Sequence, residues 1–167
     1  AINSKLPEDI VVKDAQIVPE SFHATKSAKG KIYVYSILNS SFPSPLLRFY
    51  SYFFPLELNL EAMKRAAGYF IGVHDFSSFR ASGSEVKTSV REIRRLEVNK
   101  NQELVTIEIE ANGFLYNMAR IIAGTLLDVG ISKLDPREIP DIIKSRDRNK
   151  AGRTLPPQGL CLKEVIY

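Results

Sequence analysis

Cysteine is almost absent from this sequence, which contains one, Cys161, among 167 residues. A single cysteine excludes a disulfide framework within the chain, and it forms no CxxC or Cys/His cluster of the spacing that binds structural zinc. No other metal-ligand spacing and no Gly-x-Ser-x-Gly motif occurs either. We therefore expect an intracellular, cytoplasmic protein that holds no metal.

Long apolar runs are also missing. Charged residues such as Lys64, Arg120 and Asp128 interrupt the most apolar stretches well before membrane-spanning length. The sequence does not begin with a basic region followed by an apolar core, so we expect a chain that neither spans a membrane nor is exported. With 44% apolar residues, 167 residues are enough for one domain, 1–167, with a core of its own.

The charge is mildly basic. Lysine plus arginine exceeds aspartate plus glutamate by 23 − 19 = 4, which favours polyanionic partners only weakly. The basic residues gather in three clusters: Lys26, Lys29 and Lys31; Arg91, Arg94 and Arg95; and Lys144, Arg146, Arg148, Lys150 and Arg153. A solvated surface explains any one of these clusters as well as a nucleic-acid contact does.

The pattern of the first two thirds predicts strands around one helix. Residues 31–39 are rich in β-branched and aromatic side chains, which favours a strand. Apolar residues recur at helical spacing within 59–72, with Asn59 as the N-cap and Gly72 as the terminator. Residues 91–99 and 103–111 alternate between apolar and polar, so we expect an antiparallel pair that turns between them.

The last third predicts two helices and a closing strand. A helix over 114–129 has apolar residues at positions i, i+3 and i+4. A second begins at Asp135, where Pro136 and Glu138 complete a strong start signal. Residues 159–167 read as a strand. Because strands and helices do not alternate regularly, we predict an α+β fold with a mainly antiparallel sheet flanked by helices.

Arg120 is the most informative residue. It lies about 160–200° around the predicted helix from Met118 and Ile122, on a face that is otherwise small or apolar. A helix that is apolar all round is usually buried, and a buried guanidinium is costly unless it meets a carboxylate, a phosphate or several acceptors. The sequence therefore predicts an anionic partner for Arg120, unless its side chain reaches solvent from near the helix end.

Two further candidates have a structural alternative. Tyr33 and Tyr35, beside three lysines, combine stacking rings with charges for phosphates, although tyrosines on a half-buried strand are often core residues. His74 and Asp75 are neighbours that cannot face each other in a strand or helix, so we expect a turn held by Asp and Ser side chains rather than a catalytic pair.

The order of the motifs resembles that of the TruA-type tRNA pseudouridine synthases along almost the whole chain. The matching segments are Leu6-Pro-Glu-Asp-Ile10 with Phe22-His-Ala24, Lys31-Ile-Tyr-Val-Tyr35, Gly72-Val-His-Asp-Phe-Ser-Ser-Phe79, Phe114-Leu-Tyr-Asn-Met-Ala-Arg-Ile-Ile-Ala-Gly124 and Pro157-Gln-Gly-Leu-Cys-Leu162. The resemblance implies the C-terminal half of the pseudouridine synthase fold. It also implies isomerisation of uridine in the anticodon arm of tRNA, without cofactor or metal, by an enzyme that works as a homodimer.

The resemblance also implies roles for single residues. Arg120 is expected to pair with the catalytic aspartate of the family, and Tyr33 to be the active-site tyrosine that packs against the target base. Leu160 is expected to line the pocket, and Lys31 and His74 to contact the substrate.

The sequence departs from the family pattern in two places that matter. The Gly-Arg-Thr-Asp motif that carries the catalytic aspartate is missing, since Gly152-Arg-Thr154 is followed by Leu155. Thr25 stands where the family usually has arginine. We therefore expect a C-terminal portion that is inactive alone, and the alternative is an RNA-binding domain without catalysis.

Overall fold

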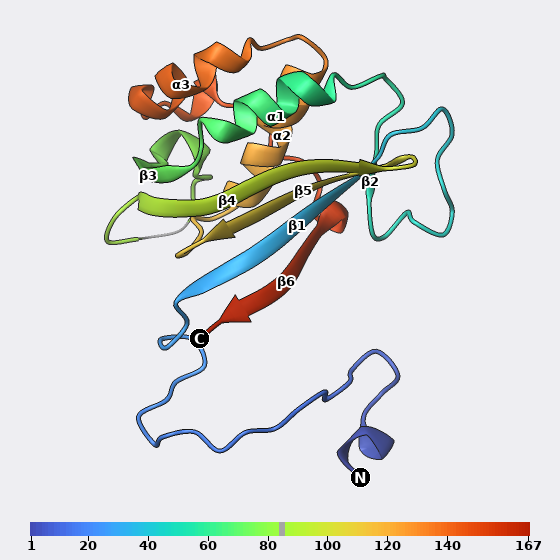
Figure 1. Ribbon diagram of the computed structural model, residues 1–167, viewed down its shortest axis with the longest axis vertical. Helices are drawn as coiled ribbons and strands as arrows, with labels where there is room; N and C mark the ends of the chain where they lie inside the picture. Colours follow the sequence, from blue (N-terminus) through green and yellow to red (C-terminus); the bar gives the residue numbers. More distant parts are fainter. Residues whose placement is uncertain (84–85) are drawn as a thin grey trace.

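The computed structural model describes residues 1–83 and 86–167, and its centre is one mainly antiparallel sheet (Figure 1). Its strands are β1 (Gly30–Leu38), β2 (Tyr52–Phe53), β3 (Gly72–Asp75), β4 (Val90–Asn101), β5 (Leu104–Ala111) and β6 (Leu160–Ile166). The order is β2-β1-β5-β4-β3, and β6 also pairs with β1. Among the strand pairs of the described residues only the short β1–β2 pair is parallel, so the predicted α+β class is confirmed.

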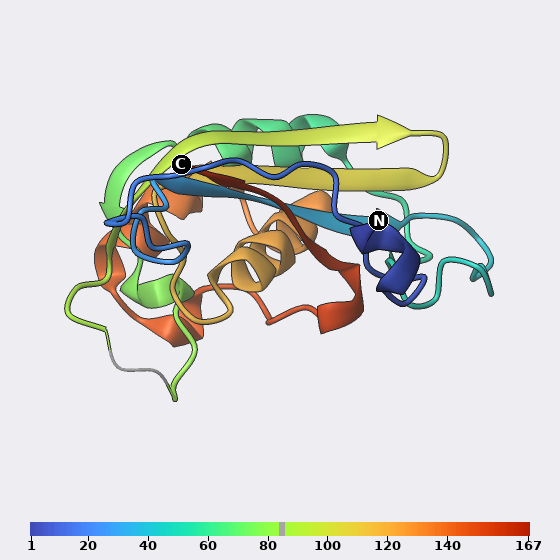
Figure 2. The ribbon, with the colours of Figure 1, turned by 90° about the horizontal axis from the view of Figure 1, so that it is seen from below.

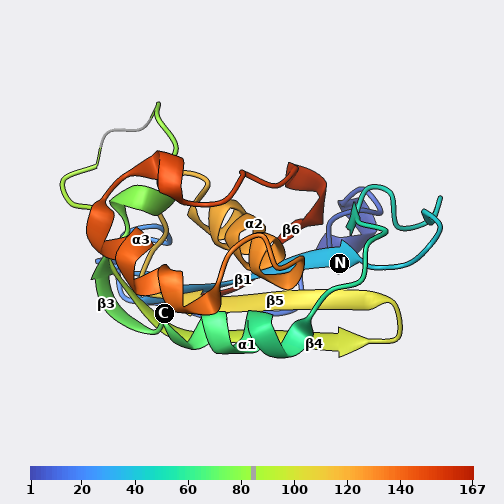
Figure 3. The ribbon, with the colours of Figure 1, turned by 90° about the horizontal axis from the view of Figure 1, so that it is seen from above.

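The described part of the chain contains three α-helices: α1 (Leu60–Gly68), α2 (Met118–Gly130) and α3 (Ile139–Ser145). Figure 3 shows α1 running alongside β4. Helix α1 contacts both β4 and α2 extensively. Side chains alternate between the two faces of the sheet, and one face is buried against the helices. On the opposite face Arg95 of β4 and Lys163 of β6 both pair with Glu108 of β5. The core therefore lies on the helical side of the sheet.

The N-terminal segment and one loop stand apart from this body. Residues 1–20 run as an exposed arm with one 3-10 turn, Ile2–Lys5 (Figure 1), and residues 40–50 form a projecting loop between β1 and β2 (Figure 2). No helix among the described residues is long and apolar enough to cross a membrane.

Helix α1 begins where the sequence predicts and ends earlier. The Asn59 side chain accepts a hydrogen bond of 2.9 Å from the Ala62 amide, as expected of an N-cap. The helix ends at Gly68 rather than at Gly72, and Phe70 and Ile71 then donate to carbonyls three residues back. Gly72 instead opens β3 with φ of +108°, a conformation that suits glycine. The predicted terminator is therefore the start of a strand.

The hairpin of β4 and β5 follows the predicted alternation, and every second residue of β5 is buried. Its turn is tighter than predicted: the strands extend to Asn101 and Leu104, leaving Gln102 and Glu103 between them. Gln102 takes a positive φ of 52° because a two-residue hairpin turn needs left-handed backbone.

Helix α2 is buried along its length, as the pattern predicts, but it begins at Met118 and not at residue 114. Every residue of α2 except Arg120 is buried. Asn117 adopts the left-handed conformation, with φ of 59°, which a continuing helix cannot contain. Phe114, Leu115 and Tyr116 therefore form a short crossing segment before the helix.

Helix α3 confirms the start signal at Asp135. The Asp135 and Glu138 side chains form the two hydrogen bonds of a capping box, and a 3-10 turn, Pro136–Glu138, leads into the helix.

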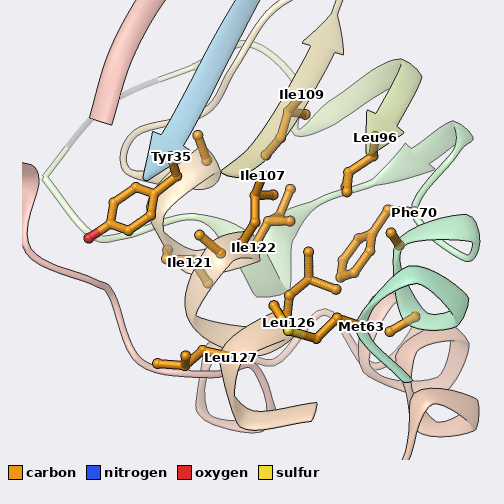
Figure 4. Packing of buried hydrophobic residues seen from close by; sticks show 14 of the residues in the cluster. Tyr35, Met63, Phe70, Leu96, Ile107, Ile109, Ile121, Ile122, Leu126 and Leu127 are labelled. Carbon is orange, nitrogen blue, oxygen red and sulfur yellow. The ribbon is translucent and has the colours of Figure 1, made fainter. Parts of the chain in front are cut away.

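Figure 4 shows part of the hydrophobic core. Phe70 and Met63 of the α1 region meet Ile122 and Leu126 of α2, against Ile107 and Ile109 of β5.

Candidate functional site

Four of the five predicted site residues line one cavity. Tyr33 and Lys31 of β1, Arg120 of α2 and Leu160 of β6 surround a cavity of about 230 Å³, here named the Arg120 cavity. Residues 114–119 supply the rest of its wall. Segments far apart in the sequence thus converge where α2 crosses β1, and Arg120 is part-buried in the wall rather than on open surface.

The guanidinium of Arg120 is held by neutral oxygens. Its Nε donates to the Leu155 carbonyl at 2.6 Å, and its Nη1 donates to the Asn117 Oδ1 at 2.9 Å. Within 1–83 and 86–167 it forms no ion pair with a carboxylate. Two acceptors cannot saturate the five N–H donors of an arginine, so Arg120 can still bind an anion in the cavity.

The acceptor carbonyl of Leu155 belongs to a segment, 152–157, that is fastened to α2 and β1. The Gly152 amide donates to Thr125 Oγ1 at 2.9 Å, and the buried Tyr35 hydroxyl donates to the Pro156 carbonyl at 2.7 Å. Burial raises the pKa of Tyr35 well above its usual range, so the hydroxyl stays a donor. The segment thereby fixes the Leu155 carbonyl, and through it the direction of Arg120.

Arg153 tethers the same segment. Its Nη2 lies 3.6 Å from the Oδ1 of Asp128, a buried oxygen without a hydrogen-bond partner in the described chain, and Lys133 lies 3.3 Å from the other oxygen. The Gly152-Arg153-Thr154 tripeptide is thus part of a structural fastening.

The Tyr33 ring forms an aromatic wall of the cavity together with Phe114. The two ring centroids lie 4.8 Å apart at 83°, an edge-to-face arrangement that restrains the Tyr33 ring. Leu160 is part-buried at the start of β6, beside them. An aromatic face, an aliphatic side chain and a cation around one cavity are the groups with which proteins hold an unstacked base.

His74 does not join this cavity. It lies on the edge strand β3, where its Nε2 is 3.0 Å from the Ile71 carbonyl and its ring meets Phe76 edge-to-face. A separate cavity of about 400 Å³ is lined by His74 together with Lys144 and Arg146. Substrate contact by His74 stays a prediction, and any such contact would lie away from Arg120.

Asp75 holds a turn, as predicted. Its Oδ1 accepts from the Ser77 amide at 3.0 Å, the Ser77 hydroxyl at 2.6 Å and the Ser89 hydroxyl at 2.5 Å, and its Oδ2 meets Arg146 Nε at 2.9 Å. Burial raises the pKa of Asp75, but the hydrogen bonds from Ser77 and Ser89 and the charge of Arg146 outweigh it, so the pKa lies below its usual value. The ionised carboxylate therefore stabilises the fold.

We expect Asp75→Asn to lower the free energy of unfolding at neutral pH by about 1–2 kcal/mol, because charge-assisted hydrogen bonds are lost. Since the folded pKa is depressed, the contribution of Asp75 is complete above the unfolded pKa of about 4 and disappears as the pH falls through the folded pKa. Urea denaturation of both proteins across this range measures the difference. Asp9→Asn, on the exposed arm, is the control, and a pH-independent difference would contradict this account.

Sequence reasoning missed three parts of the site. The sequence pattern puts Phe114 and Asn117 inside the helix, whereas in the structure Phe114 lies in the crossing segment against Tyr33 and Asn117 lies at the N-cap of α2, bonded to Arg120. An asparagine before an apolar helix is a signal for a left-handed or capping position, and it could have identified Asn117. No sequence signal identifies the Leu155 carbonyl, because a backbone acceptor depends only on tertiary packing.

The fold and the cavity define an α+β domain suited to holding a nucleic-acid base beside an arginine. Comparison with known proteins specifies the class further. The family model described as tRNA pseudouridine synthase matches residues 66–167, more than half of the chain. "tRNA pseudouridine synthase A" from Thermoanaerobacter sp. strain X514 and that from Acetivibrio thermocellus are each 54% identical over all 167 residues, which cover 68% of either protein.

"tRNA pseudouridine synthase A 2" from Clostridium perfringens is 48% identical over the same length. The chain belongs to the tRNA pseudouridine synthase family. It corresponds to a C-terminal portion of these relatives, about two thirds of their length rather than the half that the motifs suggested.

Proposed function

We propose that this chain is the part of a TruA-type pseudouridine synthase that holds the target uridine of tRNA, in the anticodon arm. One observation carries the proposal: Tyr33, Arg120, Leu160 and Lys31, which come from β1, α2 and β6, line the same cavity. The isomerisation exchanges the bond from the ribose C1′ to N1 of uracil for a bond to C5; the C5 hydrogen leaves as a proton, and N1 takes up a proton.

Arg120 has a defined part in this proposal. A catalytic carboxylate that reaches the cavity would meet the N–H groups of Arg120 that Leu155 and Asn117 leave unused. The pair would neutralise the guanidinium and fix the carboxylate beside the ribose, because a charge-assisted pair is strong and directional. We propose that the carboxylate comes from the region of the relatives that this chain does not span.

Tyr33 and Leu160 would hold the base itself. The ring of Tyr33, restrained by Phe114, offers a flat face for stacking, and Leu160 offers an apolar contact. Lys31 at the rim would contact a phosphate of the strand.

The test uses the complete enzyme, meaning this chain joined to the region of its relatives that it does not span. The substrate is tRNA whose uracil carries tritium at C5. It should release tritium with the complete enzyme and should release no tritium with this chain alone. If the complete enzyme binds tRNA but releases no tritium, the chain is an RNA-binding module without catalysis and the proposal fails.

Tyr33→Ala in the complete enzyme should lower tritium release about ten- to a hundredfold, since stacking of one base on an aromatic ring is worth about 1–3 kcal/mol. Tyr33→Phe keeps the ring and should keep most of the activity if packing is its role. An equal loss in both variants would assign the effect to the hydroxyl instead, and full activity of Tyr33→Ala would exclude Tyr33 from the site.

Two properties of the complete enzyme rest on the resemblance alone and complete the proposal. It would act as a homodimer, which sedimentation equilibrium measures directly. It would act in the cytoplasm, where fluorescence of the tagged enzyme in cells would place it.

A further inference from the structure

A second, more polar cavity adjoins the Arg120 cavity. It has a volume of about 450 Å³ and is named here the Arg91 cavity. Lys31 and Phe114 line both cavities, so the two cavities are neighbours. The remaining lining residues are Thr25, Ala28, Gly30, Thr88, Val90, Arg91, Asn112 and Gly113.

The charge of this cavity is positive. Arg91 and Lys31 both line it, and none of the lining residues that the structure describes is acidic. The neighbouring Glu92 is engaged elsewhere, because its Oε2 accepts from Arg94 Nε at 3.2 Å. The hydroxyls of Thr25 and Thr88 and the amide of Asn112 add polar groups that suit an oxyanion.

The Arg91 guanidinium is positioned by the backbone on one side only. Its Nη1 donates to the Thr88 carbonyl at 2.9 Å and the Val90 carbonyl at 2.6 Å. Its Nε and Nη2 have no hydrogen-bond partner in the part of the chain that the structure describes. Gly113 lies beside this edge of the guanidinium, since a Cβ added to it would be in ordinary contact with the Arg91 Nε at 3.5 Å. An arginine held in this way presents a directed pair of donors.

We propose that the Arg91 cavity binds a phosphodiester group of the RNA strand, next to the nucleotide held in the Arg120 cavity, with Arg91 as the main donor and Lys31 as the second cation. This inference rests on the proposed function. A phosphate is the anion that a nucleotide carries beside its base, and an arginine edge matches its two oxygens. Because Lys31 and Phe114 line both cavities, a nucleotide held in one would carry its phosphate toward the other.

Binding of an unmodified tRNA transcript to the 167-residue chain, measured by fluorescence anisotropy across a salt series, tests this site. Arg91→Ala should weaken binding and should reduce the slope of log K against log salt by about 0.7–0.9, the value for one lost phosphate contact. Arg91→Lys keeps the charge and should restore the slope but only part of the affinity, because the directed donor pair is lost.

Arg137→Ala is the matched control, since it removes the same charge from an exposed side chain that pairs with Asp135 and lies beside Arg65 of α1, in neither of the two cavities. Equal effects of Arg91→Ala and Arg137→Ala would mean a general charge effect and would overturn the site. An unchanged slope with Arg91→Ala, in a variant with the thermal midpoint of the unaltered chain, would overturn it as well.

Two further outcomes separate the sources of the anion and the two proposals. Inorganic phosphate at constant ionic strength should compete with tRNA only weakly, and to the same extent for the unaltered chain and for Arg91→Ala. Stronger competition for the unaltered chain than for Arg91→Ala would indicate a free-phosphate site instead. Complete absence of tRNA binding by the unaltered chain would contradict the proposed function itself. Normal binding that ignores Arg91 would contradict this site alone.

Discussion

Replacing Arg120 with alanine in the complete enzyme is expected to lower tritium release from C5-labelled tRNA by about a hundredfold to a few thousandfold. The loss of one member of a buried charge pair costs about 3–5 kcal/mol, and each 1.4 kcal/mol corresponds to about a tenfold change in rate. The carboxylate that Arg120 is proposed to hold would keep its charge but lose its orientation. Tight binding of tRNA should persist, because the loss concerns the reacting groups.

The conservative variant Arg120→Lys distinguishes orientation from charge. Arg120 uses two separate nitrogens, Nε and Nη1, for the Leu155 carbonyl and the Asn117 side chain. The single ammonium nitrogen of a lysine cannot take both positions and also bind a carboxylate, so we expect the activity of Arg120→Lys to be close to that of Arg120→Ala. Arg65→Ala, on the exposed side of α1, serves as the charge-matched control and should retain activity. Turnover by Arg120→Ala that equals the unaltered enzyme would remove Arg120 from the catalytic site.

Helix α2 shows how far the sequence could lead. The apolar pattern on both sides predicted a buried helix, and its burial at every residue but Arg120 confirms this. The same pattern marked Arg120 as the exception and predicted an anionic partner for it; within 1–83 and 86–167 its partners are neutral oxygens. The pattern could not identify the Leu155 carbonyl as an acceptor, because Leu155 lies 35 residues later and contributes only a backbone group.

The errors in element ends have a common physical cause. Phe70 and Phe114 fit a helical period, but both side chains pack against other elements: Phe70 against Phe79 and Phe114 against Tyr33. Helix propensities of ordinary residues differ from one another by only about half a kcal/mol per residue, and the tertiary contacts of a large aromatic ring outweigh such a difference. The periodic pattern therefore extended each helix by one turn too many, at the end of α1 and at the start of α2.

The convergence of Tyr33, Lys31, Arg120 and Leu160 could not be obtained from spacing. The pairing of β1 with β6, which brings Tyr35 opposite Leu160 and Tyr33 opposite Leu162, joins segments more than 120 residues apart. The family resemblance named these residues, and the sheet topology explains why they meet. His74 came from the same resemblance, yet β3 lies at the opposite edge of the sheet from β6.

The fastening of segment 152–157 leads to the second large effect. A Cβ added at Gly124 would lie 1.9 Å from the Arg153 carbonyl oxygen, closer than any non-bonded contact allows. The obstacle is backbone, so no side chain can rotate away. Gly124→Ala must push segment 152–157 off α2, and with it the Leu155 carbonyl that orients Arg120.

We therefore expect Gly124→Ala to lower the free energy of unfolding by about 3 kcal/mol, the upper end for overpacking of a core. For a chain of this size that corresponds to a fall of about 6–12 °C in the thermal midpoint, measured by circular dichroism on the 167-residue chain. Gly68→Ala is the matched control, because an added Cβ there meets nothing within 4 Å and should leave the midpoint unchanged or raise it slightly.

Activity separates displacement of the segment from loss of stability. Assayed in the complete enzyme well below its thermal midpoint, where the protein is fully folded, Gly124→Ala should still release tritium more slowly, because Arg120 has lost its carbonyl partner. Gly68→Ala should match the unaltered enzyme in the same assay. Normal turnover by a folded but destabilised Gly124→Ala enzyme would show that Arg120 is oriented without Leu155, and that segment 152–157 contributes to the fold and not to the site.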